Sequence, residues 1–421
     1  MADTTVFPRF RWFVLAALCI STIATTIQMI APATVMGIIA KEFGTDLGTT
    51  TGTIMGLFPL AVGVSCLIGG ALIDRFGFIR IALASMILLI ISSLLVPVLG
   101  QDLGGIALIR ILQGLASGPI LVVISPAAAL WFPRKERAIV AGLQGMSVSI
   151  GFALGFAIAP SIFQAIESWQ NMMAWLSIFG FVGLIMVLIV VFGPKPPVTR
   201  PKADPDTISD FKLALRQPVT WVGVAIFCCG SWLLQAFNDL TPAYLAIDPP
   251  VGIGFGPVKA GQIMGIYMLA FLIFAGISGF IMNKVFRNNA RPVIFIGFLF
   301  AAIFCTSIMF QFVYSNMPVL MICLILAALG AFTMPCAVAF ITLSYPPYIT
   351  GKIEGLWQGL GIFGGAIGVL IGAAALRGTG NYQLSIIILG IVAVVGAIIS
   401  FFITPSKVFC VNEEGRVVKA P

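Results

Sequence analysis

The chain has 421 residues, of which 60% are hydrophobic and only 9% are charged, and its formal net charge is +8. A soluble domain carries about a quarter charged residues, so this composition excludes a water-soluble globular protein. The eight cysteines show no metal-ligand spacing and histidine is absent, so we expect no metal site and no cofactor.

Apolar runs that are long enough to cross a bilayer as helices recur along the whole chain. They are continuous rather than alternating in polarity, which favours helices over the strands of a membrane barrel. The basic N-terminal segment leads into the first run without a cleavage signature, so we expect an uncleaved first span. The twelve expected spans are residues 12–39, 50–73, 78–99, 104–131, 138–165, 171–193, 218–246, 259–282, 291–313, 317–344, 353–376 and 382–404.

The 23 lysines and arginines are divided unevenly among the connections between these spans. Nineteen lie in the N-terminal segment, the C-terminal tail and every second connection. Three lie in the other connections, Lys41, Lys259 and Arg377, and Arg110 falls within the fourth span. Because positive residues concentrate in cytoplasmic connections, we expect both termini in the cytoplasm and the chain in the inner membrane. This distribution also explains the net charge without nucleic acid as a partner.

The longest connection, residues 193–218, is rich in proline and charge and reads as a cytoplasmic linker. We therefore expect an N-terminal six-helix bundle at residues 1–193, a linker at 194–217, a second bundle at 218–406 and a cytoplasmic tail at 407–421. Residues 207–216 could form a short helix on the membrane surface. Residues 69–77 and 141–145 resemble residues 278–286 and 355–359 in the same order, as in the internal repeats of secondary transporters.

Two motifs identify a family resemblance. Residues 70–77 read Gly-Ala-Leu-Ile-Asp-Arg-Phe-Gly, and span 4 carries Arg-Ile-Leu-Gln-Gly from Arg110 to Gly114. These match the patterns G-x-L-x-D-R-x-G and R-x-x-Q-G, and on them the chain resembles the major facilitator superfamily. The resemblance implies an all-α membrane protein with twelve transmembrane helices in two pseudo-symmetric six-helix bundles. It further implies transport rather than enzymatic activity, a central cavity lined by spans 1, 4, 7 and 10, and a functional monomer.

The connection after span 2 is a candidate gate. Asp74 lies among basic residues near helix ends, where an ionic cluster can hold the cytoplasmic side closed until it breaks. Phe78 and Ile79 stand where the family usually has two basic residues, which departs from its pattern. The alternative is that the arginines there only anchor the topology. The candidate gating residues are Gly70, Asp74, Arg75, Gly77, Arg137 and Glu354.

Two charged residues fall within apolar spans and are candidates for the site, because a charge inside a bilayer is costly. Arg110 would anchor an anion, and Asp239 in span 7 would carry a proton. The alternatives are that the family resemblance alone accounts for Arg110 and that Asp239 lies in a wet outer mouth. Pro335 predicts a bend in span 10 beside Thr333. The polar candidates for substrate contact are Gln28, Gln113, Ser117, Trp232, Gln235, Asn238 and Thr333.

These residues predict a secondary active transporter that works by alternating access and moves a small organic anion, such as a monocarboxylate, together with a proton. One fixed positive charge suits one carboxylate. The antiporter signature of the family needs a proline directly after a glycine in span 5, but Phe156 follows Gly155. The alternatives are efflux or facilitated transport of a neutral or cationic compound, with Trp232, Trp357 and Tyr244 as aromatic contacts, and a non-transporting membrane receptor.

Overall fold

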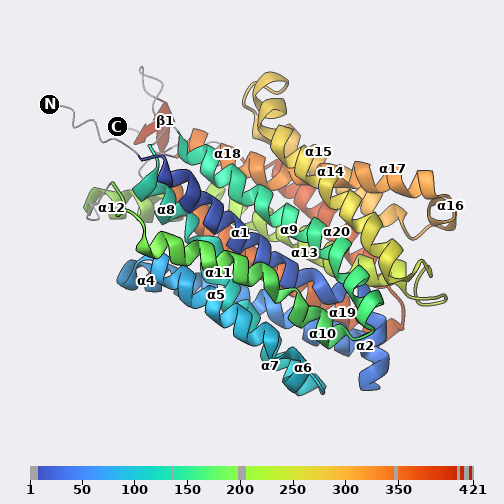
Figure 1. Cartoon of the computed structure of the whole chain (residues 1–421). Helices are drawn as coiled ribbons and strands as arrows, with labels where there is room; N and C mark the ends of the chain where they lie inside the picture. Colours follow the sequence, from blue (N-terminus) through green and yellow to red (C-terminus); the bar gives the residue numbers. More distant parts are fainter. Residues whose placement is uncertain are drawn as a thin grey trace. The chain divides into compact units, whose positions relative to one another are not determined.

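The computed structural model describes residues 8–133, 136–197, 205–345, 349–404, 408–411 and 417–419, and helices make up nearly all of this part (Figure 1). Eleven helical stretches in it are long and apolar enough to cross a membrane. The helix Phe78–Leu94 is apolar but shorter, and with it the described chain has twelve apolar stretches. The predicted all-helical membrane fold is therefore confirmed.

Packing divides the chain into two compact units. The first unit comprises residues 1–201 and 241–268, and the second comprises residues 202–240 and 269–421. Helices α13 (Pro218–Ala246) and α14 (Gly256–Lys284) thus contribute one part to each unit. The bundle limits expected at residues 193 and 218 stay a prediction.

The first unit is built around α1, which packs against α9 and α11. Helix α4 packs against α7, and α5 packs against both α7 and α11 (Figure 1). Besides its parts of α13 and α14, its elements are α1 (Phe10–Ile30), η1 (Ala31–Val35), α2 (Met36–Phe43), α3 (Leu47–Thr51), η2 (Gly52–Gly56), α4 (Leu57–Phe76), α5 (Phe78–Leu94), α6 (Val96–Leu99), α7 (Leu103–Val122), α8 (Ile124–Trp131), α9 (Arg137–Ile166), α10 (Trp169–Trp175) and α11 (Ser177–Phe192).

Side-chain caps and one glycine set the ends of the helices that carry the candidate residues. The carboxylate of Asp102 accepts the backbone N–H of Gly105 at 2.8 Å and starts α7, the helix of Arg110. Helix α4 ends at Gly77, whose φ of +85° lies in a region that residues with a side chain rarely adopt. The chain can therefore turn directly into α5.

Residues 241–268 belong to the first unit because they pack closely against it. A Cβ placed on Gly261 of α14 would collide with the carbonyl oxygen of Phe156 in α9. A Cβ on Gly37 of α2 would lie 2.7 Å from the side chain of Ile247. Glycine allows these backbones to approach more closely than any other residue would.

The second unit contains α15, which packs against α17, η4, α18 and α20, while α19 packs against α20 and α18. A helix, α12, forms within the linker where residues 207–216 predicted one. Besides its parts of α13 and α14, the elements of this unit are α12 (Pro205–Leu215), α15 (Ala290–Ser307), α16 (Gln311–Tyr314), α17 (Met317–Ala327), η4 (Ala328–Phe332), α18 (Thr333–Ser344), α19 (Thr350–Thr379), α20 (Gln383–Ser400), β1 (Phe409–Val411) and β2 (Val417–Lys419).

The tenth span is interrupted where the sequence predicted a bend. The 3-10 helix η4 ends at Phe332, and α18 begins at Thr333, two residues before Pro335. Because proline has no N–H, it cannot donate a hydrogen bond to the carbonyl four residues earlier, which belongs to Ala331 in η4. The tail then forms a small antiparallel hairpin in which Phe409 pairs with Lys419.

Glycines of α19 bring it into close contact with α13. A Cβ on Gly364 would lie 2.5 Å from the carbonyl oxygen of Cys228, and a Cβ on Gly368 would lie 2.8 Å from the indole ring of Trp232. Gly361 makes a similar approach to Phe227, at 2.9 Å. This face of α19 therefore has no room for larger side chains.

Candidate functional site

Arg110 is fully buried in α7, and backbone carbonyl oxygens surround its guanidinium group. Its Nε donates to the carbonyl of Ile54 at 2.6 Å, its Nη1 to that of Gln28 at 2.8 Å and its Nη2 to that of Met29 at 2.7 Å. The ring of Phe58 lies 4.4 Å from the guanidinium carbon. One side chain thus connects α1, η2 and α7.

Two prolines explain why two of these carbonyls are open to Arg110. In an α-helix the carbonyl of residue 28 would accept the N–H of residue 32. Residue 32 is Pro32, which has no N–H. Residue 54 lies in a π-helical turn, where its partner would be residue 59, and this is Pro59. Arg110 therefore satisfies acceptors that the two prolines leave open in an apolar environment.

A polar chain continues from Arg110 through the first unit. The Oε1 atom of Gln113 accepts from Arg110 at 3.0 Å, and its Nε2 donates to Ser93 at 3.2 Å. The hydroxyl of Ser117 donates to the backbone carbonyl of Gln113 at 2.7 Å. Gln28 donates through Nε2 to the carbonyl of Met173 at 3.1 Å. The four candidates of spans 1 and 4 thus lie in one connected network within this unit.

Asp239 and Gln235 form the polar centre of α13 in the second unit. Asp239 is fully buried, and its Oδ2 accepts from the Nε2 of Gln235 at 2.6 Å. Asn238 is also fully buried and donates to the carbonyl of Leu234 at 2.7 Å, while its Oδ1 has no hydrogen-bond partner among the described residues.

The other two candidates of the second unit contact neighbouring helices. Trp232 is half-buried and packs against Gly368 of α19. A Cβ on Gly365 of the same helix would lie 3.1 Å from the Cβ of Gln235. This face of α13 is therefore turned towards α19. Thr333 donates to the carbonyl of Gly330 at 2.9 Å at the start of α18.

The structure describes three of the six gating candidates fully. Arg75 is exposed, with its guanidinium carbon 5.2 Å from the ring of Phe76, and Gly77 forms the turn between α4 and α5. Glu354 is half-buried and accepts from Gln358 at 2.9 Å. The side chains of Asp74 and Arg137 and the surroundings of Gly70 lie outside the described part.

An ion pair at the start of α1 is a contact that sequence reasoning missed. The Nη2 of Arg11 lies 3.1 Å from the carboxylate of Glu136, and both side chains are largely buried. The guanidinium also lies beside the rings of Trp12 and Phe132, at 5.7 and 5.8 Å. The signal was the single acid, Glu136, in a run of basic residues. The pair connects the beginning of the chain to the segment before α9.

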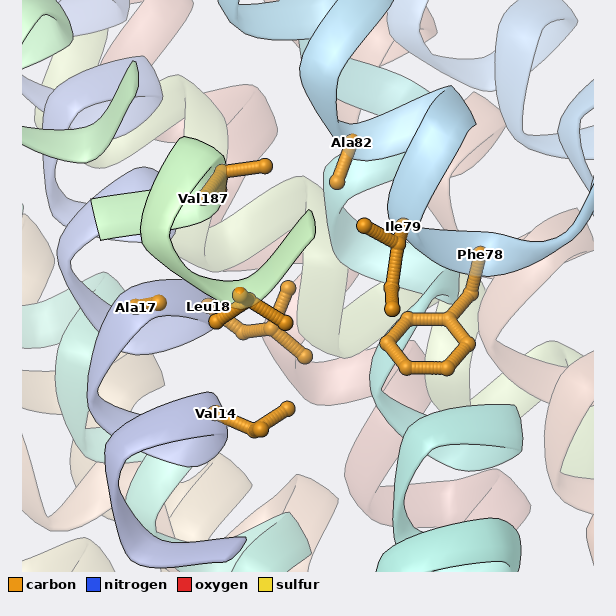
Figure 2. A pocket seen from close by; sticks show the side chains of 8 residues that line it. Val14, Ala17, Leu18, Phe78, Ile79, Ala82 and Val187 are labelled. Carbon is orange, nitrogen blue, oxygen red and sulfur yellow. The ribbon is translucent and has the colours of Figure 1, made fainter. Parts of the chain in front are cut away.

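The first unit also contains a small apolar pocket between α1, α5 and α11 (Figure 2). Its labelled side chains are aliphatic or aromatic and come from all three helices, among them Leu18, Phe78 and Val187. Because its lining offers no polar side chain, it does not suit an anion, and Arg110 is not part of it.

Comparison with known proteins identifies the family. The family model of the Major Facilitator Superfamily matches residues 16–290 and 249–409. The hexuronate transporter of Bacillus subtilis is 25% identical over 266 residues, which cover 60% of this chain and 61% of that protein. The probable sulfoacetate transporter of Cupriavidus necator is 22% identical over 424 residues, which cover 94% of each chain.

A solved structure supports the fold. The bacterial homologue of the human lysosomal transporter Spinster, in an inward-facing and unoccupied conformation, matches with a TM-score of 0.73 at 14% sequence identity. The match covers 94% of this chain and 97% of that one. Together with the family model and the two motifs, it shows that the chain belongs to the Major Facilitator Superfamily and is a multi-pass membrane transporter rather than an enzyme.

Proposed function

We propose that this protein moves a small organic anion across the inner membrane by alternating access, together with a proton. The observation that carries the proposal is the charge of Arg110. Within the part of the chain that the structure describes, Arg110 is the one lysine or arginine that is fully buried. Its guanidinium carries a positive charge inside the apolar first unit, and a charge acts strongly on other charges in a medium of low dielectric constant. A solute of opposite charge is favoured near it.

The relatives support the same chemistry. Hexuronate and sulfoacetate, which name two of them, are both organic anions. In our proposal the anion approaches Arg110 within the network of Gln28, Gln113 and Ser117. The proposed contacts of the second unit are Trp232, Gln235, Asn238 and Thr333.

Asp239 is the proposed carrier of the proton. It is fully buried in α13, and the Nε2 of Gln235 donates to its Oδ2 at 2.6 Å. In our proposal the proton bound at Asp239 moves in the same direction as the anion.

The remaining features of the proposal follow from charge. The uneven distribution of lysine and arginine supports cytoplasmic termini. The proposed gating residues of the first unit are Gly70, Asp74, Arg75, Gly77 and Arg137, and that of the second unit is Glu354. The protein works as a monomer.

Uptake by purified protein in proteoliposomes tests the function. The probes are labelled D-glucuronate and sulfoacetate, with choline as the cationic comparison, each with and without an inward proton gradient. We expect uptake of an anionic probe and none of choline. Arg110→Gln should lower anion uptake by about 100-fold, because a charge-assisted contact contributes roughly 1.5–3 kcal/mol. Arg110→Lys keeps the charge and should retain a measurable part of the uptake.

A second variant separates transport from coupling. Asp239→Asn should abolish accumulation that a proton gradient drives but preserve exchange of labelled for unlabelled anion, since exchange needs no net proton movement. Uptake of choline in place of the anions would favour the cationic alternative. Equal anion uptake by the wild type and Arg110→Gln would remove Arg110 from the site.

A further inference from the structure

A cluster of contacts joins four separate segments of the second unit at one end of α13. The segments are the linker helix α12, the start of α13, Tyr345 directly after α18, and the tail strand β1. The tail and the linker are separated by nearly 200 residues of sequence, and neither belongs to the transport site discussed above. The transport site therefore does not explain why Tyr345 connects the tail to the linker helix.

Side chains of α13 fix the C-terminal end of α12. The hydroxyl of Thr220 donates to the carbonyl of Ala214 at 2.6 Å, and the indole N–H of Trp221 donates to that of Leu215 at 2.9 Å. The last carbonyls of a helix have no partner within it, so these bonds act as a cap. Ala214 is fully buried, and Lys352 of α19 lies 5.7 Å from the ring of Phe211. The linker helix is thus docked on its unit.

Tyr345 connects this cap to the tail. Its hydroxyl lies 2.8 Å from that of Thr220. Because the one hydroxyl hydrogen of Thr220 is used by Ala214, Tyr345 is the donor. Burial raises the pKa of Tyr345 to about 12, although the hydrogen bond with Thr220 lowers it, so the hydroxyl keeps its hydrogen at physiological pH.

Phe409 of the tail covers Tyr345. The two rings have centroids 5.8 Å apart and are tilted by 56°. Phe409 is only 4% exposed, although it comes from a short tail hairpin, and Tyr345 is fully buried. Pairing between β1 and β2 fixes the direction of the strand that carries Phe409. The tail hairpin therefore completes a buried contact instead of extending into solvent.

We infer that the C-terminal hairpin is a strap that holds the linker helix α12 on the second unit. Phe409 packs on the ring of Tyr345, the hydroxyl of Tyr345 donates to Thr220, and Thr220 caps α12. Loss of the tail contact should therefore loosen the linker helix.

Hydrogen–deuterium exchange on the purified full-length protein tests the docking without any substrate. Phe409→Ala should raise the exchange rates of the amides in residues 209–217 by about tenfold, because an aromatic contact of this kind is lost. Tyr345→Phe keeps the ring contact but loses the bond to Thr220, and should give a smaller increase. Phe402→Ala, at a side chain that is 64% exposed, is the matched control and should leave these amides unchanged.

Amide exchange rates at residues 209–217 that equal those of Phe402→Ala would overturn the docking role of the tail. The test needs no transport, so its outcome is independent of the proposed function.

Discussion

Arg110 shows how one buried side chain can serve both structure and charge. Its guanidinium group has donors and no acceptor, and it donates to three backbone carbonyls, two of which are neighbours in α1. The prolines that open two of these carbonyls, those of Gln28 and Ile54, lie in different helices, so the arginine compensates for both prolines at once. A neutral amide could reach one of these acceptors but not all three, because only the guanidinium group presents five donors in a rigid fork.

A double-mutant cycle tests this interpretation. Arg110→Gln should destabilise the protein by about 2–4 kcal/mol, because it leaves backbone carbonyls unpaired in an apolar environment. Pro32→Ala restores the N–H that the carbonyl of Gln28 needs. The decrease in the free energy of unfolding caused by Arg110→Gln should therefore be smaller in the Pro32→Ala background, by about 1–2 kcal/mol.

The measurement is thermal unfolding of each purified variant in the same detergent, followed by circular dichroism. Pro97→Ala provides a control, because Pro97 lies in α6 and has no part in the carbonyl cluster. Strictly additive losses of Arg110→Gln and Pro32→Ala would contradict the account.

The sequence predicted some features of the candidate site and not others. Arg110 and Asp239 stood out because each is a charge in an apolar run, and both are buried. Their contact with a substrate stays a prediction. The acceptors around Arg110 are backbone carbonyls, which leave no trace in the sequence except a proline further along the helix. The partner of Glu136 was equally hidden, because Arg11 is 125 residues away.

At the scale of elements, helix type and approximate limits followed from hydropathy, whereas interruptions within spans did not follow from proline alone. Pro335 lies beside the 3-10 turn η4, but Pro119, Pro160 and Pro242 lie within continuous α-helices. Whether a proline interrupts a helix depends on whether a neighbouring donor or a small change in the local backbone satisfies the carbonyl that the proline leaves open. Both depend on tertiary packing. The π-helical turn η2 was therefore not predictable.

The glycines of α19 lead to a prediction at this scale. Gly364→Ala would place a Cβ 2.5 Å from the carbonyl oxygen of Cys228 and 2.6 Å from its Cα, and neither backbone atom can move easily. We expect this substitution to lower the free energy of unfolding by about 1–3 kcal/mol and to lower the Tm. Gly355→Ala and Gly378→Ala on the same helix meet nothing within 4 Å. These controls should be neutral or slightly stabilising, because alanine has the higher helix propensity.

Circular dichroism at rising temperature would measure all three variants in one detergent. A Tm for Gly364→Ala that equals those of the two controls would show that α19 does not pack on α13 in this way.

At the scale of the whole molecule, composition and hydropathy were sufficient for the class, since 9% charge is incompatible with a water-facing domain of this size. Neither composition nor hydropathy predicted how the chain divides into two packing units. Residues 241–268 follow the linker in sequence but pack with residues 1–201, through approaches such as that of Gly261 to Phe156. Nothing in a hydropathy profile distinguishes the two possible partners of an apolar helix.

Membrane orientation provides the prediction at this scale. Single cysteines at Lys202 and Lys407 should both react with a membrane-impermeant maleimide only from the cytoplasmic side, because the distribution of lysine and arginine predicts that linker and tail lie there. A cysteine at Lys259 should react only from the other side. Right-side-out and inside-out vesicles give the two measurements. Labelling of positions 202 and 407 from opposite sides would contradict the twelve-span topology.

The contact of Trp232 with Gly368 gives the protein an optical reporter of its own. An indole ring pressed against bare peptide backbone has no solvent on that side, and any sliding of α19 along α13 changes what the ring touches. Emission from a version that keeps this tryptophan alone would follow that sliding in real time, with no dye attached to the chain.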